Sequence, residues 1–260
     1  MNSEKNTIIR ARVTAVHRER YQLVCEYGEI YARLKTKEYY VELEEFPTTG
    51  DFVAIRYIPN GDSQIIKTLP RKTFFSRLDP TPGRGEQAVA ANFDYVFIMQ
   101  SLNHDFNAKR LERYMTLAWQ SGATPIVLLT KADLLEAYEE YLECVARVAI
   151  GVEVYPVSSK TGFGLEKLEK FLQPGKTVVF LGSSGVGKSS LVNALAGKEI
   201  MGVNGILHLL LPVLWHIPVL FYACNQKICI SPDTVPHPQK LHQVPSKHPT
   251  CQHCAFLGYQ

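Results

Sequence analysis

Over roughly the first 70 positions, apolar residues alternate with polar ones in short runs, which is typical of half-buried β-strands. Turn-forming residues separate the runs, Tyr27-Gly28 in one place and Pro59-Asn-Gly-Asp62 in another. About five strands in so short a stretch predict a small barrel of the oligonucleotide/oligosaccharide-binding (OB) type. We expect this barrel to occupy residues 1–72, with strands at residues 8–16, 21–26, 29–34, 50–58 and 64–67.

The pattern changes beyond the barrel. Residues 70–85 are rich in proline, glycine and basic side chains, which favours a linker over residues 73–92. Near-continuous apolar runs then alternate with runs of helical periodicity, and this alternation predicts a parallel sheet buried on both faces. This α/β domain is expected to span residues 93–201, with strands at 95–99, 125–129, 152–157 and 177–181 and helices at 108–120, 134–149 and 165–172.

The fourth apolar run leads into a glycine-rich loop with the pattern G-x-x-x-x-G-K-S. A strand before such a loop and a helix after it are the context of a phosphate-binding loop, whose backbone N–H groups surround an anion. Lys188 would reach the β- and γ-phosphates, and the Ser189 hydroxyl would bind Mg²⁺, so both are assigned catalytic roles. A glycine-rich turn without a ligand leaves the Lys-Ser pair unexplained. The predicted phosphate-binding residues are Gly182, Ser183, Ser184, Gly185, Val186, Gly187, Lys188, Ser189 and Ser190.

Two further polar segments follow neighbouring apolar runs and suit a guanine base. Thr130-Lys-Ala-Asp133 fits the pattern [NT]-K-x-D, in which a carboxylate accepts hydrogen bonds from N1–H and the 2-amino group of guanine. Adenine offers neither donor, so Asp133 would discriminate against it. Asp133 could instead simply cap the following helix. The complete guanine-binding set is Thr130, Lys131, Ala132, Asp133, Ser158, Ser159 and Lys160, in which Ser158–Lys160 resembles the S-[AS]-K loop.

The order of these motifs is unusual, because Asp133 precedes Gly182 by about 50 residues whereas most GTPases carry the phosphate loop first. With a barrel in front, the chain resembles the circularly permuted GTPases of the ribosome small-subunit-dependent family. The resemblance covers roughly residues 7–201 and includes residues 87–94 and 105–114. It implies an OB-like barrel followed by a circularly permuted P-loop GTPase domain with a mainly parallel sheet.

The resemblance also implies a function. Family members would be cytoplasmic bacterial GTPases that use GTP, GDP and Mg²⁺ and act late in assembly of the 30S ribosomal subunit, with the barrel on ribosomal RNA. We expect a monomer with no membrane association. The net charge of +3 is too small to indicate nucleic acid by itself. The barrel's basic and aromatic residues could be RNA contacts or solvated strand faces, and only the resemblance favours the first: Arg10, Arg12, Arg18, Arg20, Arg33, Lys35, Lys37, Tyr21, Tyr31, Tyr39 and Tyr40.

Residues 202–260 do not match the family. No threonine lies between Thr177 and Thr234, so the switch threonine that completes the Mg²⁺ shell has no candidate. Asp233-Thr-Val-Pro236 lies where D-T-P-G could be expected, but Pro236 has no N–H to offer the γ-phosphate. We therefore expect impaired hydrolysis. The strand that normally follows the phosphate-loop helix is also lost, so we expect an incomplete sheet and an unstable fold.

This tail has three interpretations. Residues 202–226 are long and apolar enough for a transmembrane segment, although Pro212 and Pro218 argue against one. The family carries zinc, but the spacing of the Cys and His residues fits no standard site, so no zinc ligands are assigned. The joint loss of composition and motifs favours a third interpretation, an end produced by a reading-frame shift. The zinc candidates considered were Cys224, Cys229, Cys251, His253 and Cys254.

The sequence thus leads to a GTP-binding protein of the ribosome-assembly type. A non-catalytic RNA-binding module with a defective GTPase domain is the alternative. An ATP-using phosphoryl transferase would fit Gly182–Ser189 but leaves Thr130–Asp133 unexplained.

Overall fold

The structure, a computed structural model, describes residues 8–17, 20–35, 46–78, 86–103, 105–197 and 219–222. Within these residues, no helix is long and apolar enough to cross a membrane. The zinc candidates, residues 233–236 and most of the predicted apolar segment 202–226 lie outside the described residues.

The N-terminal part is a closed five-stranded barrel, as predicted. Its strands are β1 (Ile8–Val16), β2 (Tyr21–Cys25), β3 (Gly28–Leu34), β4 (Phe52–Arg56) and β5 (Ser63–Thr68). They follow the order β1-β2-β3-β5-β4, in which only the β3–β5 pair is parallel. The alternating apolar positions point inward and form a core of their own that includes Val13, Leu23, Ile55 and Ile65.

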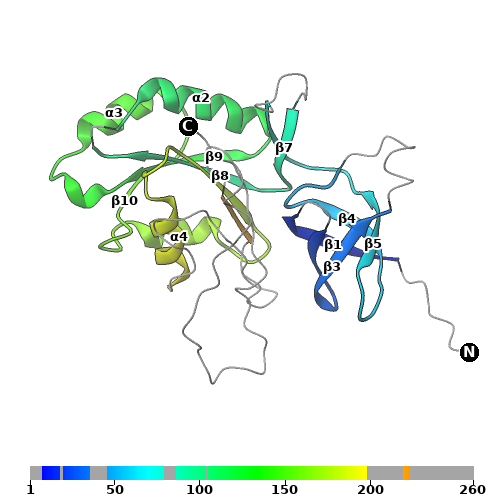
Figure 1. Cartoon of the computed structure of the whole chain (residues 1–260). Coiled ribbons are helices and arrows are strands. Elements are labelled where there is room, and N and C mark those ends of the chain that lie inside the picture. Colours follow the sequence, from blue (N-terminus) through cyan, green and yellow to red (C-terminus); the bar gives the residue numbers. More distant parts are fainter. Residues whose placement is uncertain are drawn as a thin grey trace, which may run out of the picture.

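The segment expected to be a linker instead forms a two-stranded antiparallel sheet, which corrects that part of the prediction. Its strands are β6 (Phe74–Leu78) and β7 (Glu86–Ala91). The Ala91 N–H donates to the Thr49 carbonyl of the barrel, and the Phe74 N–H donates to the Ser121 carbonyl beside the α/β sheet. This hairpin therefore bonds to both neighbours, and it lies between them (Figure 1). The domain limits at residues 72, 92 and 201 stay predictions.

The second sheet is parallel and has the order β10-β9-β8-β11-β12. Four of its strands fall where the apolar runs predicted them: β8 (Tyr95–Ser101), β9 (Thr124–Thr130), β10 (Val154–Val157) and β11 (Thr177–Leu181). A fifth strand, β12 (Val219–Tyr222), comes from the atypical tail and pairs with β11. A strand thus does follow the helix after the glycine-rich loop, contrary to the expectation that this strand is lost (Figure 1, orange).

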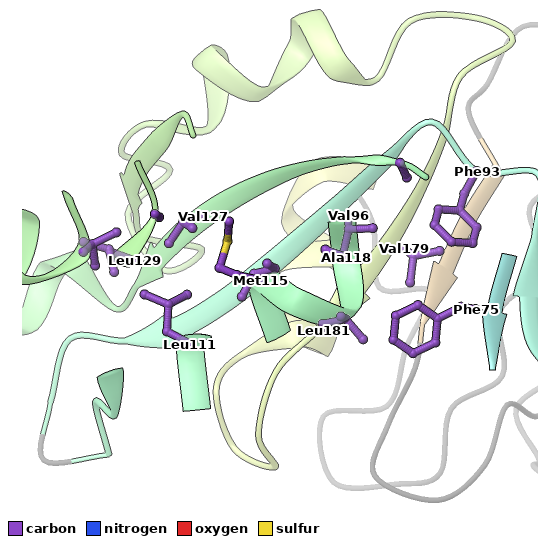
Figure 2. Close-up of a cluster of buried hydrophobic side chains, with 14 of the residues drawn as sticks. Phe75, Phe93, Val96, Leu111, Met115, Ala118, Val127, Leu129, Val179 and Leu181 are labelled. Atoms are coloured by element: carbon purple, nitrogen blue, oxygen red, sulfur yellow. The ribbon is translucent and has the colours of Figure 1, made fainter. Parts of the chain in front are cut away.

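Helical segments cover both faces of this sheet. One face carries α2 (Ala108–Gln120) and α3 (Glu139–Val148), and the other carries α4 (Lys188–Ala196) and the 3₁₀ segment η2 (Leu165–Phe171). Successive residues of β8 serve opposite cores, since Val96 and Ile98 pack under α2 while Phe97 and Met99 pack toward α4. Figure 2 shows the first core, which also takes in Phe75 from the hairpin.

Two predicted helices differ from the structure. Lys131 has a left-handed backbone (φ 61°), and only the short 3₁₀ turn η1 (Ala132–Leu134) follows it, so α3 begins at Glu139 rather than at residue 134. The predicted helix at 165–172 is 3₁₀-helical rather than α-helical. By contrast, α2 has the predicted bounds, and the Asn107 side chain caps it by accepting from the Arg110 N–H at 2.9 Å.

Arg12 of β1 joins the barrel to the α/β sheet. Its guanidinium donates to the Gly50 carbonyl (3.3 Å), to the Asn92 carbonyl (2.9 Å) and to the Thr177 hydroxyl (3.0 Å) at the start of β11. Burial lowers the pKa of Arg12 to about 10, against the opposing charge of Asp94. Arg12, expected as an RNA contact, is therefore occupied within the molecule.

We expect Arg12→Ala to lower the free energy of unfolding by about 2–3 kcal/mol, because it removes the hydrogen bonds that a half-buried guanidinium makes. Arg10→Ala is the matched control: Arg10 lies on the same strand, is exposed, and stacks over the Phe52 ring at 3.8 Å. Its loss should cost at most about 1 kcal/mol. Urea denaturation of both variants measures the difference, and equal losses would contradict the importance of the Arg12 junction.

Candidate nucleotide-binding site

The glycine-rich loop connects β11 directly to α4, which begins at Lys188. A Cβ at Gly182 would lie 2.9 Å from Val186 Cγ1 and 3.0 Å from the Met99 carbonyl oxygen, so only glycine fits there. Gly185 (φ 73°) and Gly187 (φ 101°) have left-handed backbones. The first N–H groups of a helix lack intrahelical partners, so this loop ends at a favourable position for an anion.

Lys188 is buried, and its ammonium group lies within the curl of the loop. Nζ donates to the Gly182 carbonyl at 2.7 Å and to the Ser183 carbonyl at 2.6 Å. These bonds place the charge beside the backbone that would surround a phosphate. A lysine in this position can act as a point charge on phosphate oxygens.

A buried hydrogen bond links the phosphate loop to the end of β9. The Thr130 hydroxyl donates to the Val186 carbonyl at 2.7 Å, across 56 residues of sequence. Thr130 and Val186 are both almost fully buried. The first residue of the T-K-A-D segment therefore touches the loop that was predicted to hold the phosphates.

A second link joins the two predicted guanine segments. The Ser158 hydroxyl donates to Asp133 Oδ1 at 2.6 Å and accepts from the N–H groups of Lys160 and Thr161, both at 3.2 Å. The Asp133 carboxylate is thereby oriented by the neighbouring loop and remains exposed to solvent. The structure brings together Thr130, Asp133, Ser158 and the phosphate loop, which are far apart in sequence. The binding roles of these residues stay predictions.

The Ser189 hydroxyl fits a Mg²⁺ ion in chemical type. It lies in the first turn of α4, and it makes no hydrogen bond to another residue that the structure describes. Mg²⁺ prefers oxygen ligands and takes few of them from a protein, the rest coming from phosphates and water. Within the described part of the chain, no group of three His, Cys, Asp or Glu side chains could hold a metal ion.

One contact at this site escaped sequence reasoning. The Ser183 hydroxyl donates to Asp105 Oδ2 at 2.8 Å, and Asp105 pairs with Arg110 at 3.1 Å. Asp105 lies in the connection between β8 and α2, next to the carboxyl end of a sheet strand. This position was the signal in the sequence that could have identified Asp105, because polar residues that follow parallel strands gather at the ligand-binding edge of the sheet.

The barrel carries an exposed group of basic and aromatic side chains. Arg20 and Arg33 both bind Asp62, and the Arg20 guanidinium lies 4.5 Å from the centre of the Tyr31 ring. These arginines lower the pKa of Asp62 to about 2. Tyr21, in contrast, is buried in the barrel core, so it is not available to stack on a base. Arg18, Lys37, Tyr39 and Tyr40 lie outside the described residues.

In the parallel sheet, the glycine-rich loop of the phosphate-binding type follows β11, the fourth strand in sequence. The loops of the guanine-binding type follow the two strands that precede β11 in sequence. This order defines a circularly permuted P-loop fold. Residues 68–210 match the RsgA GTPase family, so the match extends past residue 201, where we expected the resemblance to end. The chain belongs to this family.

Two curated relatives illustrate the similarity. The chain is 50% identical over 196 residues to "Small ribosomal subunit biogenesis GTPase RsgA 1" of Listeria monocytogenes, covering 75% of this chain and 55% of the relative. It is 40% identical over 206 residues to "Small ribosomal subunit biogenesis GTPase RsgA 2" of Lactiplantibacillus plantarum, covering 78% and 58%. The chain thus spans little more than half the length of these relatives.

Two solved structures share the fold. The crystal structure of YjeQ from Thermotoga maritima superposes with a TM-score of 0.61 at 25% identity, covering 73% of this chain and 65% of that one. YloQ, described as a circularly permuted GTPase, superposes with a TM-score of 0.57 at 22% identity, covering 75% and 66%.

Substitution of Gly164 by alanine tests how the Ser158 loop is held in place. The φ angle of Gly164 is 73°, and a Cβ there would lie 2.4 Å from the Pro156 carbonyl oxygen of β10. Gly162 (φ 83°) is the matched control, since a Cβ there meets nothing within 4 Å. We expect Gly162→Ala to cost about 1–2 kcal/mol of unfolding free energy from backbone strain alone. Gly164→Ala should cost clearly more in the same urea titration, and equal costs would contradict the close approach to β10.

Proposed function

We propose that this chain binds guanine nucleotides at the carboxyl edge of the parallel sheet and derives from a GTPase of small-subunit ribosome assembly. The observation that carries the proposal is the pair of hydrogen bonds Thr130–Val186 and Ser158–Asp133, which unite three loops distant in sequence. Family membership and the names of the relatives support it.

Each loop would contribute a different part of the recognition. Gly182–Ser190 would enclose the phosphates, with Lys188 as the cation and Ser189 as the protein ligand of Mg²⁺. Asp133 would accept from guanine N1–H and the 2-amino group, while the Lys131 stem lies along the base. The Ser158–Lys160 loop would orient Asp133 and offer a backbone N–H to guanine O6. When bound, Mg²⁺ would neutralise negative charge on the β- and γ-phosphates.

The partner would be the 30S subunit in the cytoplasm, with the barrel on ribosomal RNA. Arg20, Arg33 and Tyr31 lie together on the barrel surface and suit phosphate contact and base stacking. Asp62 pairs with both arginines and reduces the positive charge of this group.

Hydrolysis by this chain would be impaired. The sequence offers no switch threonine between Thr177 and Thr234, and Pro236 has no N–H for the γ-phosphate. The proposed activity is therefore nucleotide binding, with slow release of phosphate by attack of water on the γ-phosphate.

Asp133→Asn tests the guanine assignment. The amide should weaken GDP binding by at least about 100-fold, because one acceptor becomes a donor facing the 2-amino group. Xanthosine diphosphate, which carries an oxygen there, should gain affinity in the same variant. Calorimetry measures both, with exposed Glu136→Gln in the adjoining segment as the control that should bind GDP normally. Equal affinity of the unmodified chain for ADP and GDP would overturn the assignment.

Phosphate release tests the hydrolysis proposal. An activator that completes a GTPase site can accelerate hydrolysis by about 10³–10⁵-fold. We expect 30S subunits to accelerate phosphate release from the GTP-bound chain far less than this. A phosphate-sensor assay with and without purified 30S subunits measures this. Rapid, ribosome-stimulated release would show that the missing threonine is dispensable.

The alternative function is RNA binding by the barrel with the sheet as a scaffold. The exposed Tyr27 ring stacks on the half-buried Tyr57 ring, with ring centres 4.4 Å apart, and favours this candidate because such a ring can accept a base. In that case the calorimetric experiment would detect no binding of guanine nucleotides, while the chain would still bind ribosomal RNA.

A further inference from the structure

The connection between β8 and α2 places a carboxylate against the phosphate loop. Ser183 is the second residue of that loop, and its hydroxyl donates to Asp105 Oδ2 at 2.8 Å. Arg110 of α2 donates to the other oxygen of the same carboxylate at 3.3 Å and lies 3.1 Å from Oδ2. Asp105 therefore bridges a helix of the sheet's outer layer and the loop predicted to bind phosphates.

Several bonds fix Asp105 in this place. Asn103 Oδ1 accepts from the Ser101 hydroxyl at 2.8 Å and from the Asp105 N–H at 3.0 Å, which shapes the turn after β8. Asn107 then caps α2, whose first turn supplies Arg110. The carboxylate is thus held from both sides.

The phosphate loop, in contrast, is held at the Ser183 and Val186 carbonyls by Lys188 and Thr130 but has little stiffness at its glycines. Gly185 and Gly187 have left-handed backbones and no side chains that could restrict them. A flexible loop loses conformational entropy when it closes around an anion, and this loss weakens binding. A fixed acceptor for the Ser183 hydroxyl reduces that loss, because it adds a side-chain bond to the bond that Lys188 makes with the Ser183 carbonyl before the ligand arrives.

Charge is the competing consideration. A lone carboxylate beside this loop would repel a diphosphate or triphosphate. Arg110 pairs with both oxygens, so the Asp105–Arg110 unit adds little net charge to the site. The favourable effect on loop order is therefore expected to exceed the electrostatic cost.

We propose that Asp105 is a positioning residue that orders the phosphate loop through Ser183, with Arg110 neutralising its charge. The inference rests on the proposed nucleotide site. It assigns a role to a residue that lies outside the phosphate loop and the two predicted guanine segments. Asp105 acts through Ser183 and is not required to touch the nucleotide.

The first test needs no nucleotide. Asp105→Ala should accelerate amide hydrogen exchange at residues 184–187 about tenfold, as expected for losing one charge-assisted hydrogen bond. Asp105→Asn keeps an acceptor for Ser183 and should restore slow exchange. Glu112→Ala, which removes an exposed carboxylate from α2, is the control and should change nothing at these amides. Unchanged exchange in Asp105→Ala, or no rescue by Asp105→Asn, would overturn the proposal.

The second test uses binding. Asp105→Ala and Ser183→Ala should each weaken GDP binding about tenfold, and the double variant should be no weaker than either, because both remove the same bond. GMP lacks the β-phosphate that the loop would enclose, so its affinity should change less than about twofold. Additive losses, or equal losses for GMP, would overturn the proposal. If the unmodified chain bound no GDP, the proposed function would fail, whereas the exchange experiment would still decide the role of Asp105.

Discussion

The hydrogen bond from the Thr130 hydroxyl to the Val186 carbonyl sets the distance between the segment predicted to bind guanine and the loop predicted to bind phosphates. Both residues are buried, so water does not compete for this bond, and an unpaired carbonyl at Val186 would be costly. The bond is possible because β9 and β11 are parallel and flank β8 in one sheet, so that both end at the same edge. Chain order is irrelevant to this geometry, which is how the guanine segment can precede the phosphate loop in sequence.

Much of this arrangement was predictable because its signals are local. Near-continuous apolar runs predicted β8, β9 and β11, whose residues contribute to both cores of the sheet. The glycines of the phosphate loop were recognisable because close packing against Met99 or a left-handed backbone requires them. The bounds of α2 were likewise predictable, since Asn107 is a good capping residue and an amphipathic run follows it.

The parts that were missed depend on partners remote in sequence. Proline and glycine around β6 and β7 favoured a linker, yet the backbone of this hairpin bonds to Thr49 and Ser121. The start of α3 was missed because Lys131 has a left-handed backbone, unusual for a residue other than glycine, and a short 3₁₀ turn occupies residues 132–134 before α3 begins at Glu139. Asp105 and Ser183 are 78 residues apart, and no sequence pattern connects them. β12 lies in a tail without recognisable motifs, and only its pairing with β11 places it in the sheet.

The Arg12 junction has a mechanical consequence. With a pKa of about 10, the guanidinium keeps its proton throughout the physiological range, so changes in acidity do not loosen the joint. Its acceptors belong to the barrel, to the segment after β7 and to the first residue of β11, so a rotation of the barrel against the sheet stretches at least one of these bonds. Force applied to the barrel is thereby delivered to β11 at the end opposite its glycine-rich loop. The barrel is therefore tied to the strand whose other end leads into the predicted phosphate loop.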